Sequence, residues 1–484
     1  MDEPRYIIIH GHFYQPPRES PWTGLIANEA GAVPFPNWNE RILSECYNAN
    51  AHAHIMDGRV VHIRNNFEQL NFDFGPTLFS WLERHGRAAY RAVRRGDELS
   101  HERTNGHGNA IAQSYNHSIL PLLTERDRSL QVSWGIHDFV YRFGRQPQGM
   151  WLPECGADDD TLATLARGGI RFAILGAGQG RYHKEGAHDR EAGPFMWRRE
   201  DLSLAVFRYD PQLSGELAFG EALTDGAGLA ESLARTAFSM PPGSALLLAT
   251  DGETFGHHKR AGAAELARAL AILEARDGLE LTNCDAYLAA HPAGGNFVID
   301  YPSSWSCPHG VERWRANCGC RMDQATSQEW RAPMRAAMEL VNSHAASVYD
   351  RFAGAMLKLP EEALRESPRM LLDSWAGIRE EFFLRYGVAD EAAQERLLRM
   401  FEMERAAQAA LTSCAWFFDD FGGPEGRIAL KWAARAVELA AELAPSIESE
   451  LLSELRQIKS NRREIGDAAS LYLSVKTREA RGRV

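Results

Sequence analysis

Short apolar runs alternate with amphipathic stretches through the first ~300 residues, a pattern typical of repeated strand–helix units. The apolar runs predict strands at residues 6–10, 60–64, 98–101, 148–152, 171–175, 204–209, 245–249 and 279–284. Helical periodicity predicts helices between them, at residues 76–95, 122–143, 158–167 and 261–277. About seven parallel strands, each followed by a helix, favour an α/β fold built on a (β/α)7 barrel. No glycine-rich dinucleotide fingerprint follows the first strand, which argues against a two-halved open sheet.

The hydrophobic pattern changes near residue 323. Strand-like runs disappear, and long stretches rich in Ala, Leu, Glu and Arg predict helices at residues 327–357, 361–386, 389–413, 426–443 and 446–476. Pro360, Gly422-Gly423-Pro424 and Pro445 punctuate these helices. We therefore expect two domains: a catalytic barrel over residues 1–323 and an α-helical bundle over residues 324–484.

Composition narrows the classes of partner. The chain of 484 residues is 44% hydrophobic and 24% charged, which is ordinary for a globular protein with a large core. Its net charge of −12 argues against a nucleic-acid partner, because phosphate binding needs a concentrated basic face. No apolar run approaches the ~20 residues that span a bilayer, so no membrane partner is expected. The opening resembles no signal peptide, and the seven cysteines then predict reduced thiols in the cytoplasm. The oligomeric state is not indicated.

Two acidic motifs follow strand-like runs directly. Glu154 ends GMWLPE, and Asp251 and Glu253 follow the run 245–249 in TDGETFG. Catalytic groups of α/β barrels lie at the carboxyl ends of the strands, so these acids are candidates for catalysis. Two carboxylates across a pocket can cleave a glycosidic bond, one acting on the anomeric carbon and the other protonating the leaving oxygen. Trp151 supplies an apolar wall of the kind that tunes carboxyl pKa values. A helix-initiating role for Glu154 is the alternative.

Histidines accompany these acids in several motifs. His10 and His12 follow the first strand two residues apart, so both point to one side, where they can bind sugar hydroxyls or a metal, or make structural hydrogen bonds. His107 lies between two glycines after the expected third strand, where a plain turn is the alternative. His257 follows the second acidic motif and either binds substrate or caps a helix.

The first 320 residues or so resemble the family-57 glycoside hydrolases. The resemblance rests on five motifs in the family's order: HGHFYQPP, NGHGNAIAQ, GMWLPE, TDGETFG and SSWSCPHGVERW. It implies a (β/α)7 barrel and a retaining mechanism on α-glucans, of the amylase, glucanotransferase or branching type, without a cofactor. Glu154 falls on the family's nucleophile and Asp251 on its acid/base. Residues 325–484 look like the poorly characterised helical domain of one branch of that family.

The resemblance also marks residues expected to bind an oligo- or polysaccharide substrate: His10, His12, Gln15, His107, Asn109, Trp151, Glu253, His257, His309 and Trp314. Two departures from the family bear on the substrate more than on the reaction. Phe13 and Tyr14 split the usual His-Gln-Pro, and Asn109 stands nearest to a position where a glutamate is common. We expect Glu253 to support Asp251, and the Glu154 and Asp251 carboxyl groups to lie about 5–5.5 Å apart, as retention requires.

Cys307, His309, Cys318 and Cys320 form a further constellation in the last motif. Cysteine and histidine are zinc ligands, but this spacing is atypical for a structural zinc site, so the sequence predicts a metal-free thiol cluster.

Two other functions stay open. A metal-dependent polysaccharide deacetylase has a similar barrel, and it would require His10, His12, Asp251 and His257 to converge on a divalent ion. A glycan-binding protein with a disabled barrel is the third reading. The altered first and second motifs are its only support, and both catalytic-type acids are present.

Overall fold

The computed structural model describes residues 3–57, 59–186, 188–372 and 376–480. Contacts group the chain into two compact units that are discontinuous in sequence. Unit 1 comprises Met1–Gln15, Glu29–Gln113 and Arg142–Trp305, and unit 2 comprises Pro16–Asn28, Ser114–Tyr141 and Ser306–Val484. The expected single boundary at 323/324 therefore differs from this grouping, because two segments from the first half of the chain pack with the helices of the second.

Seven strands of unit 1 pair in a closed ring. They are β1 (Arg5–Phe13), β4 (Asn71–Phe74), β5 (Ala112–Gln113), β6 (Met150–Trp151), β7 (Phe172–Gly176), β10 (Leu202–Tyr209) and β11 (Ala245–Asp251). Parallel pairing joins β11 to β1, β1 to β4, β5 to β6 and β7 to β10. Parallel bridges Phe72–Ala110 and Gly149–Phe172 join β4 to β5 and β6 to β7. The Asp210 N–H donates to the Leu247 carbonyl (2.7 Å) and closes the ring between β10 and β11. The expected (β/α)7 barrel is confirmed.

The centre of the barrel is built from strands that are apolar on both faces. Ile7, Ile8 and Ile9 of β1 are buried, as are Leu246, Leu247 and Leu248 of β11 beside them. Parallel strands covered by helices have such continuous apolar runs because neither face meets water. These two strands therefore form part of the barrel wall and bring His12 beside Asp251 near their carboxyl ends.

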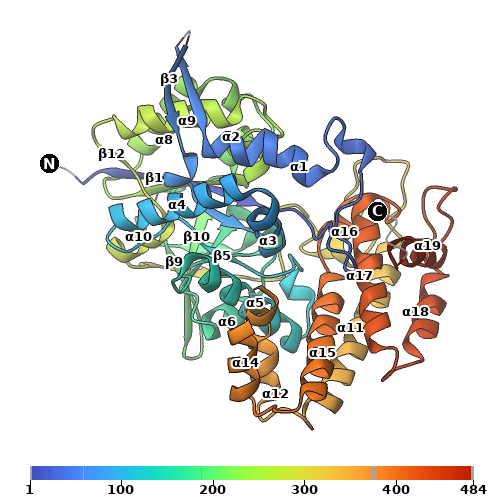
Figure 1. Ribbon diagram of the computed structural model, residues 1–484. Helices are drawn as coiled ribbons and strands as arrows, with labels where there is room; N and C mark the ends of the chain where they lie inside the picture. Colours follow the sequence, from blue (N-terminus) through green and yellow to red (C-terminus); the bar gives the residue numbers. More distant parts are fainter. Residues whose placement is uncertain (1–2, 58, 187, 373–375, 481–484) are drawn as a thin grey trace. The chain divides into compact units, whose positions relative to one another are not determined.

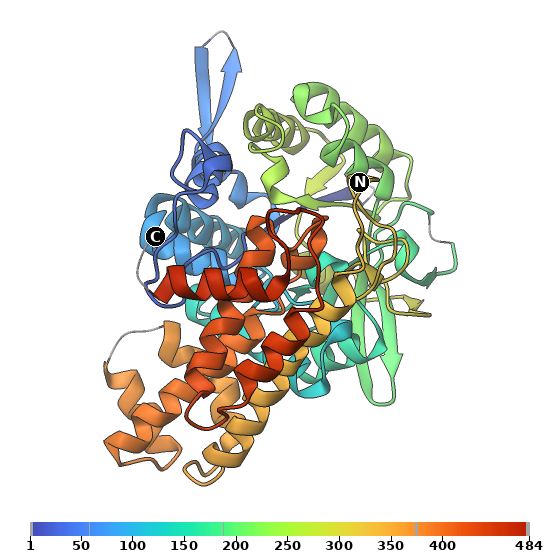
Figure 2. The ribbon, with the colours of Figure 1, turned by 90° about the vertical axis from the view of Figure 1, so that its right-hand side faces the viewer.

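Helices surround the ring and further strands extend it. The helices of unit 1 are α1 (Trp38–Ile42), α2 (Asn48–Ala51), α3 (Pro76–His85), α4 (Arg87–Arg103), α6 (Asp159–Arg167), α7 (Pro211–Ala218), α8 (Gly226–Phe238), α9 (Gly262–Glu274) and α10 (Cys284–Ala290). The additional strands are β8 (Arg181–His183), β9 (Phe195–Arg199), β12 (Leu279–Leu281) and β13 (Gly295–Val298). The antiparallel hairpin β2 (Ala53–Asp57) and β3 (Arg59–Arg64) extends away from the barrel strands (Figures 1 and 2).

Unit 2 is helical, as the second half of the sequence predicted. It contains α5 (Glu125–Phe143) up to Tyr141, α11 (Arg331–Ala353), α12 (Pro360–Glu366), α13 (Pro368–Leu372), α14 (Ala376–Arg385), α15 (Glu391–Ala409), α16 (Cys414–Phe417), α17 (Pro424–Ala440), α18 (Ile447–Leu455) and α19 (Ala468–Ala480). Helices α11, α15 and α17 pack against one another and form its centre (Figure 2). The predicted helix 361–386 includes residues 373–375, which lie outside the described residues. No helix among the described residues is long and apolar enough to cross a membrane.

Two strand predictions fail in informative ways. Residues 98–101 were expected to be a strand but lie within α4, whose buried positions Ala89, Val93 and Ser100 follow a helical period. Residues 60–64 do form a strand, but it belongs to the exposed hairpin and not to the barrel. The barrel instead uses β4 and β5, which are too short and too polar to give an apolar run. The third barrel strand is therefore β5, which lies downstream of the expected strand at residues 98–101.

Candidate active site at the carboxyl ends of the strands

The carboxyl end of β1 places a histidine between two acids. In the strand register, His12 is paired with Asp73 of β4 on one side and with Asp251 of β11 on the other. His12 Nδ1 lies 2.9 Å from Asp73 Oδ2. Burial lowers the pKa of His12, but the charges of Asp73, Asp251 and Glu253 outweigh burial and raise this pKa to about 9. At neutral pH His12 is therefore a cation held beside carboxylates.

His10 contacts the same aspartate as His12 and is buried. Its Nε2 lies 3.1 Å from Asp73 Oδ1, and the Asn71 amide lies 2.7 Å from its Nδ1. The ring is fully buried, which lowers the pKa of His10 and keeps it neutral. Trp151 stacks on both histidine rings, with centroids 4.6 Å from His10 and 5.1 Å from His12. Because Trp151 is also fully buried, we assign His10 and Trp151 to positioning and not to the substrate contact expected from the sequence.

Glu154 lies in a strained turn just beyond β6. The backbone has φ of 56° at Glu154 and 50° at Cys155, which is the left-handed region that residues with a Cβ rarely occupy. Four hydrogen bonds hold the turn: Cys155 N to Leu152 O (2.8 Å), Gly156 N to Pro153 O (2.8 Å), Trp305 N to Glu154 O (3.0 Å) and Gln179 Nε2 to Cys155 O (2.6 Å). Strain of this kind costs about 1–3 kcal/mol per residue and gathers at functional sites.

Trp305 orients the Glu154 carboxylate as well as its backbone. Its indole N–H donates to Glu154 Oε2 at 3.1 Å, and its ring meets that of Trp151 edge-on at 5.1 Å. Glu154 is half-buried. A helix-capping role for Glu154 is excluded by the geometry: the cap of α6 is Asp158, whose carboxylate accepts from Thr161 N.

The pKa of Asp251 is raised towards neutral pH. Its side chain keeps solvent access, yet the surrounding protein excludes much of the bulk water that would stabilise its charge. This desolvation raises the pKa of Asp251 to about 6, against the opposing charge of His12 and together with the charges of Glu154 and Asp73. Glu154, Asp73 and Asp251 therefore lie close enough for their carboxylates to repel one another. An acid with this pKa can both donate and recover a proton near neutral pH.

Glu253 is buried behind Asp251. Its Oε1 accepts hydrogen bonds from the Tyr47 hydroxyl (2.7 Å) and the Tyr14 backbone N–H (3.2 Å). Burial raises the pKa of Glu253 to about 7, although the Tyr47 hydrogen bond opposes the shift. The buried Gln15 also bonds to Tyr47. Tyr14, inserted between His12 and Gln15, thus uses its backbone to hold Glu253.

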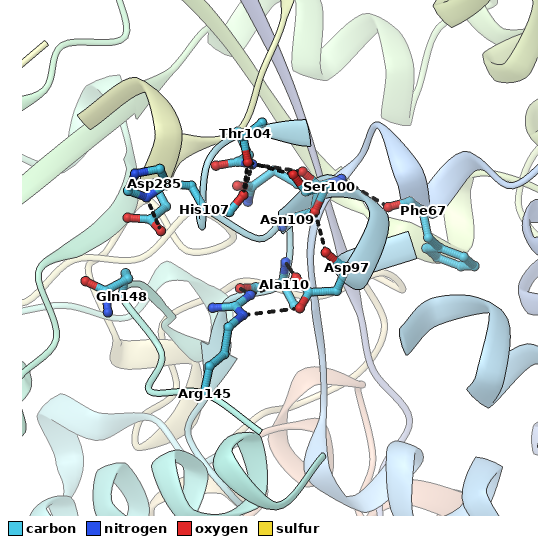
Figure 3. Close-up of polar contacts among 12 residues, drawn as sticks. Phe67, Asp97, Ser100, Thr104, His107, Asn109, Ala110, Arg145, Gln148 and Asp285 are labelled. Atoms are coloured by element: carbon cyan, nitrogen blue, oxygen red, sulfur yellow. Dashed lines mark hydrogen bonds and ion pairs between the residues drawn. The ribbon is translucent and has the colours of Figure 1, made fainter. Parts of the chain in front are cut away.

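His107 and Asn109 lie at the other ends of the strands (Figure 3). Both precede β5, whereas the sequence placed them after a strand at 98–101. Asn109 is buried, accepts from Asn283 Nδ2 (3.0 Å) and donates to the Phe67 carbonyl (3.1 Å). His107 Nδ1 lies 2.9 Å from Asp285 Oδ2. These contacts are structural, so the geometry opposes the substrate-binding role expected for this pair.

The remaining expected contacts are dispersed. His257 Nδ1 lies 2.5 Å from Glu45 Oε2. His309 and Trp314 belong to unit 2, where Trp314 is fully buried and thus not a ligand surface. Among the described residues, His10, His12, Asp251 and His257 do not form a metal-binding group, since the histidines direct ring nitrogens to Asp73 and Glu45. The ligand set required for a deacetylase is therefore not assembled.

Sequence reasoning missed two partners in this site. Asp73 lies in β4, whose polar sequence Asn-Phe-Asp-Phe gave no strand signal. Trp305 stands inside the quoted motif SSWSCPHGVERW, but Trp314 of the same motif was preferred. The sequence motif was therefore a usable signal for Trp305, whereas no local signal identified Asp73.

Sequence comparisons agree with this geometry. The sequence model described as glycosyl hydrolase family 57 matches residues 38–298, which is more than half of the chain. The chain belongs to this family. Residues 327–480 match a domain of unknown function, DUF3536. Alpha-amylase 1 of Dictyoglomus thermophilum is 24% identical over 154 residues, which is 31% of this chain and 21% of that protein. The chain thus spans about a fifth of the length of that relative.

Solved structures share the fold. An exo-type maltose-forming amylase from Pyrococcus sp. ST04 superposes with a TM-score of 0.68 at 15% identity, over 97% of this chain and 88% of that one. A branching enzyme of the same family from Thermococcus kodakaraensis gives a TM-score of 0.54 at 14% identity, over 98% and 94% of the two chains. A 4-alpha-glucanotransferase from Thermococcus litoralis gives 0.54 at 15% identity, over 90% and 60%. At these identities the likeness establishes the fold alone.

Proposed function

We propose that this protein is a retaining enzyme that hydrolyses or transfers α-glucosidic bonds of α-glucans. The observation that supports the proposal is the charge interaction between Glu154, held in a strained turn by Trp305, and Asp251, whose pKa is raised to about 6. One acid is fixed in position and the other is poised to exchange a proton. Family membership and the names of the similar structures support an α-glucan as the substrate. A cytoplasmic location stays a prediction from the sequence.

The proposed reaction has two displacements. In the first, the Glu154 carboxylate attacks the anomeric carbon while the Asp251 carboxyl protonates the departing glycosidic oxygen, which leaves a β-linked glycosyl ester on Glu154. In the second, the Asp251 carboxylate takes a proton from water or from a sugar hydroxyl, and that oxygen displaces Glu154. Two inversions restore the α configuration. The His12 cation favours the ionised form of Asp251 that the first step creates.

The expected separation of about 5–5.5 Å between the Glu154 and Asp251 carboxyl groups belongs to this proposal. Within unit 1, the charge interaction between the two acids and the register that pairs His12 with Asp251 support such closeness. A retaining enzyme needs this short span because the nucleophile itself, and not a water molecule, contacts the anomeric carbon.

The decisive experiment incubates the full chain with linear and branched α-glucans and follows the anomeric protons of the first products by NMR, with Asp251→Asn as the control. We expect new α-anomers, with longer or branched products where transfer dominates. β-Anomers formed first would contradict the retaining mechanism. Binding of the glucans without turnover would instead support a glycan-binding protein, and acetate release from acetylated polysaccharides would support a deacetylase.

A further inference from the structure

A second group of reactive side chains lies in unit 2, in the loop that follows Trp305. Cys307, His309, Cys318 and Cys320 each offer one ligand atom, and these four atoms all lie within 4.8 Å of one another. The Cys307 and Cys320 sulfurs are 3.7 Å apart, and Cys320 Sγ lies 3.5 Å from His309 Nδ1. The four side chains therefore surround one point.

The Cys307–Cys320 and Cys320–His309 separations match the edges of a tetrahedral zinc site. Zinc bonds sulfur at about 2.3 Å and histidine nitrogen at about 2.0–2.1 Å, which places two sulfurs about 3.8 Å apart and a sulfur and a nitrogen about 3.6 Å apart. A disulfide would instead join one pair and leave the other two groups without a role. A cluster that bridges several metal ions would need a wider set of ligands. The arrangement thus fits a single ion.

The local backbone is adapted to this convergence. Gly319 lies between Cys318 and Cys320 and has φ of +85°, in the left-handed region that glycine tolerates best. In an extended strand, residues two apart would point the same way but stay well separated, whereas a tight turn brings their sulfurs together. The turn is continued by Met322 and Asp323, whose N–H groups donate to the Asp419 carboxylate.

Charge provides an independent argument. Arg331 is fully buried, its Nη1 lies 3.9 Å from Cys318 Sγ, and its Nε and Nη2 have no hydrogen-bond partner among the described residues. Arg313 adds a second positive charge nearby, and Asp419 supplies one negative charge. A buried guanidinium with two unpartnered nitrogens is costly unless a negative charge lies close to it. Three thiolates, one neutral histidine and one Zn²⁺ sum to −1 and would place such a charge beside Arg331.

We propose that Cys307, His309, Cys318 and Cys320 bind one Zn²⁺ as a structural site. Four protein ligands close the coordination shell, so the ion has no open position for a substrate. The ion would hold the loop 307–320 in place. Cys307 lies two residues after Trp305, whose indole N–H binds Glu154. The sequence predicted a metal-free cluster from its atypical spacing, but spacing along the chain matters less than the meeting of the ligand atoms. The inference does not depend on the proposed reaction.

Metal analysis of the full chain tests the site directly. After purification in metal-free buffer, mass spectrometry of the elements should find about one zinc per chain. Cys318→Ser and Cys320→Ser should lower the zinc content about tenfold or more. Cys414→Ser is the matched control, because Cys414 is also half-buried in unit 2 but lies outside the cluster. It should keep the zinc of the unmodified protein.

Cysteine alkylation of the unmodified protein is a second test, and it does not depend on whether a variant folds. Bound zinc should protect Cys318 and Cys320 from alkylation, and a chelator should expose them, while Cys414 should react equally with and without the chelator. Reloading with Co²⁺ should give the charge-transfer and visible absorption of a tetrahedral thiolate complex. Zinc at background level, alkylation indifferent to the chelator, or a disulfide between Cys307 and Cys320 would each overturn the proposal.

Discussion

Two polar clusters lie at the opposite ends of the barrel, and their difference separates function from structure. The carboxyl-end cluster comprises His12, Asp73, Glu154, Asp251 and Glu253; the amino-end cluster comprises Asp97, His107, Asn109, Arg145 and Asp285. In the amino-end cluster Arg145 neutralises Asp97 through two hydrogen bonds of 2.7 and 3.2 Å, and Asp97 also accepts from Ala110 N. In the carboxyl-end cluster the acids outnumber the cation and repel one another.

The amino-end cluster also explains the glycines around His107. A Cβ at Gly108 would lie 2.2 Å from Arg145 Nη2 and 2.3 Å from Asp97 Oδ1, so only glycine lets this ion pair approach the backbone. Gly108 therefore serves packing. At the carboxyl end, by contrast, strain falls on Glu154, a residue that gains nothing in stability from a left-handed backbone. Neutralisation of Asp97 by Arg145 thus marks a structural cluster, and tolerated repulsion and strain mark a catalytic one.

The largest effect should come from Glu154→Ala, which removes the proposed nucleophile. We expect turnover to fall about 10⁴-fold or more, and azide to restore part of it with a substrate that has an activated leaving group. The product of rescue should be a β-glycosyl azide, because only one displacement occurs. NMR of the product and steady-state rates measure both outcomes.

Glu154→Gly is the matched control for folding. It removes the same carboxylate but relieves the left-handed strain. Its melting temperature should therefore equal or exceed that of the unmodified protein, and its free energy of unfolding should be higher by up to about 1 kcal/mol. Near-normal turnover in either folded variant would contradict the mechanism.

The next largest effect should come from Asp251→Asn, which removes the proposed acid/base. Turnover of natural α-glucans should fall about 10²–10⁴-fold, while substrates with activated leaving groups should be cleaved at nearly normal rates in the first step. In the unmodified enzyme kcat/KM should fall as pH rises through about 6, because the protonated form of Asp251 is the donor. A pH profile of Asp251→Asn that keeps this alkaline limb would assign the titration to another group.

The amino-end cluster should respond in the opposite way. Asp97→Asn leaves Arg145 without a charge partner in a mostly buried setting and should cost about 3 kcal/mol of stability. Turnover per folded molecule should stay within about twofold, because this cluster does not touch the reacting atoms. Thermal unfolding and active-site titration distinguish the two quantities. Loss of turnover with unchanged stability would show that the amino end takes part in function.

Local patterns predicted much of the fold and the two central acids. The apolar runs that became β7, β10 and β11 are long enough to identify strands, and an acid directly after such a run falls at the carboxyl end of a barrel. Glu154 and Asp251 could therefore be proposed from sequence alone.

Features that depend on distant contacts could not be predicted in this way. β4 and β5 are strands only because neighbouring strands pair with them, and without β5 the end of the barrel to which His107 belongs was assigned wrongly. Asp73 meets His12 across 61 positions, and Trp305 meets Glu154 across 151. Hydrophobic periodicity is a local pattern and therefore cannot predict such pairs.

The smallest effect should come from Glu253→Gln, and it tests which acid of the second motif is catalytic. The amide oxygen still accepts from Tyr47 and Tyr14, so activity should fall less than in Asp251→Asn; the reverse ranking would move the acid/base role to Glu253.

The pKa of Glu253 is about 7 in the folded protein against 4.5 for an ordinary glutamate. Between these values the folded state holds a proton that the unfolded state has lost, so stability decreases as pH rises. Glu253→Gln removes this decrease and should stabilise the protein above pH ~7 by about 2–3 kcal/mol. Glu280→Gln, on the exposed face of β12, controls for lost charge, and melting temperatures at pH ~5 and ~8 supply the comparison.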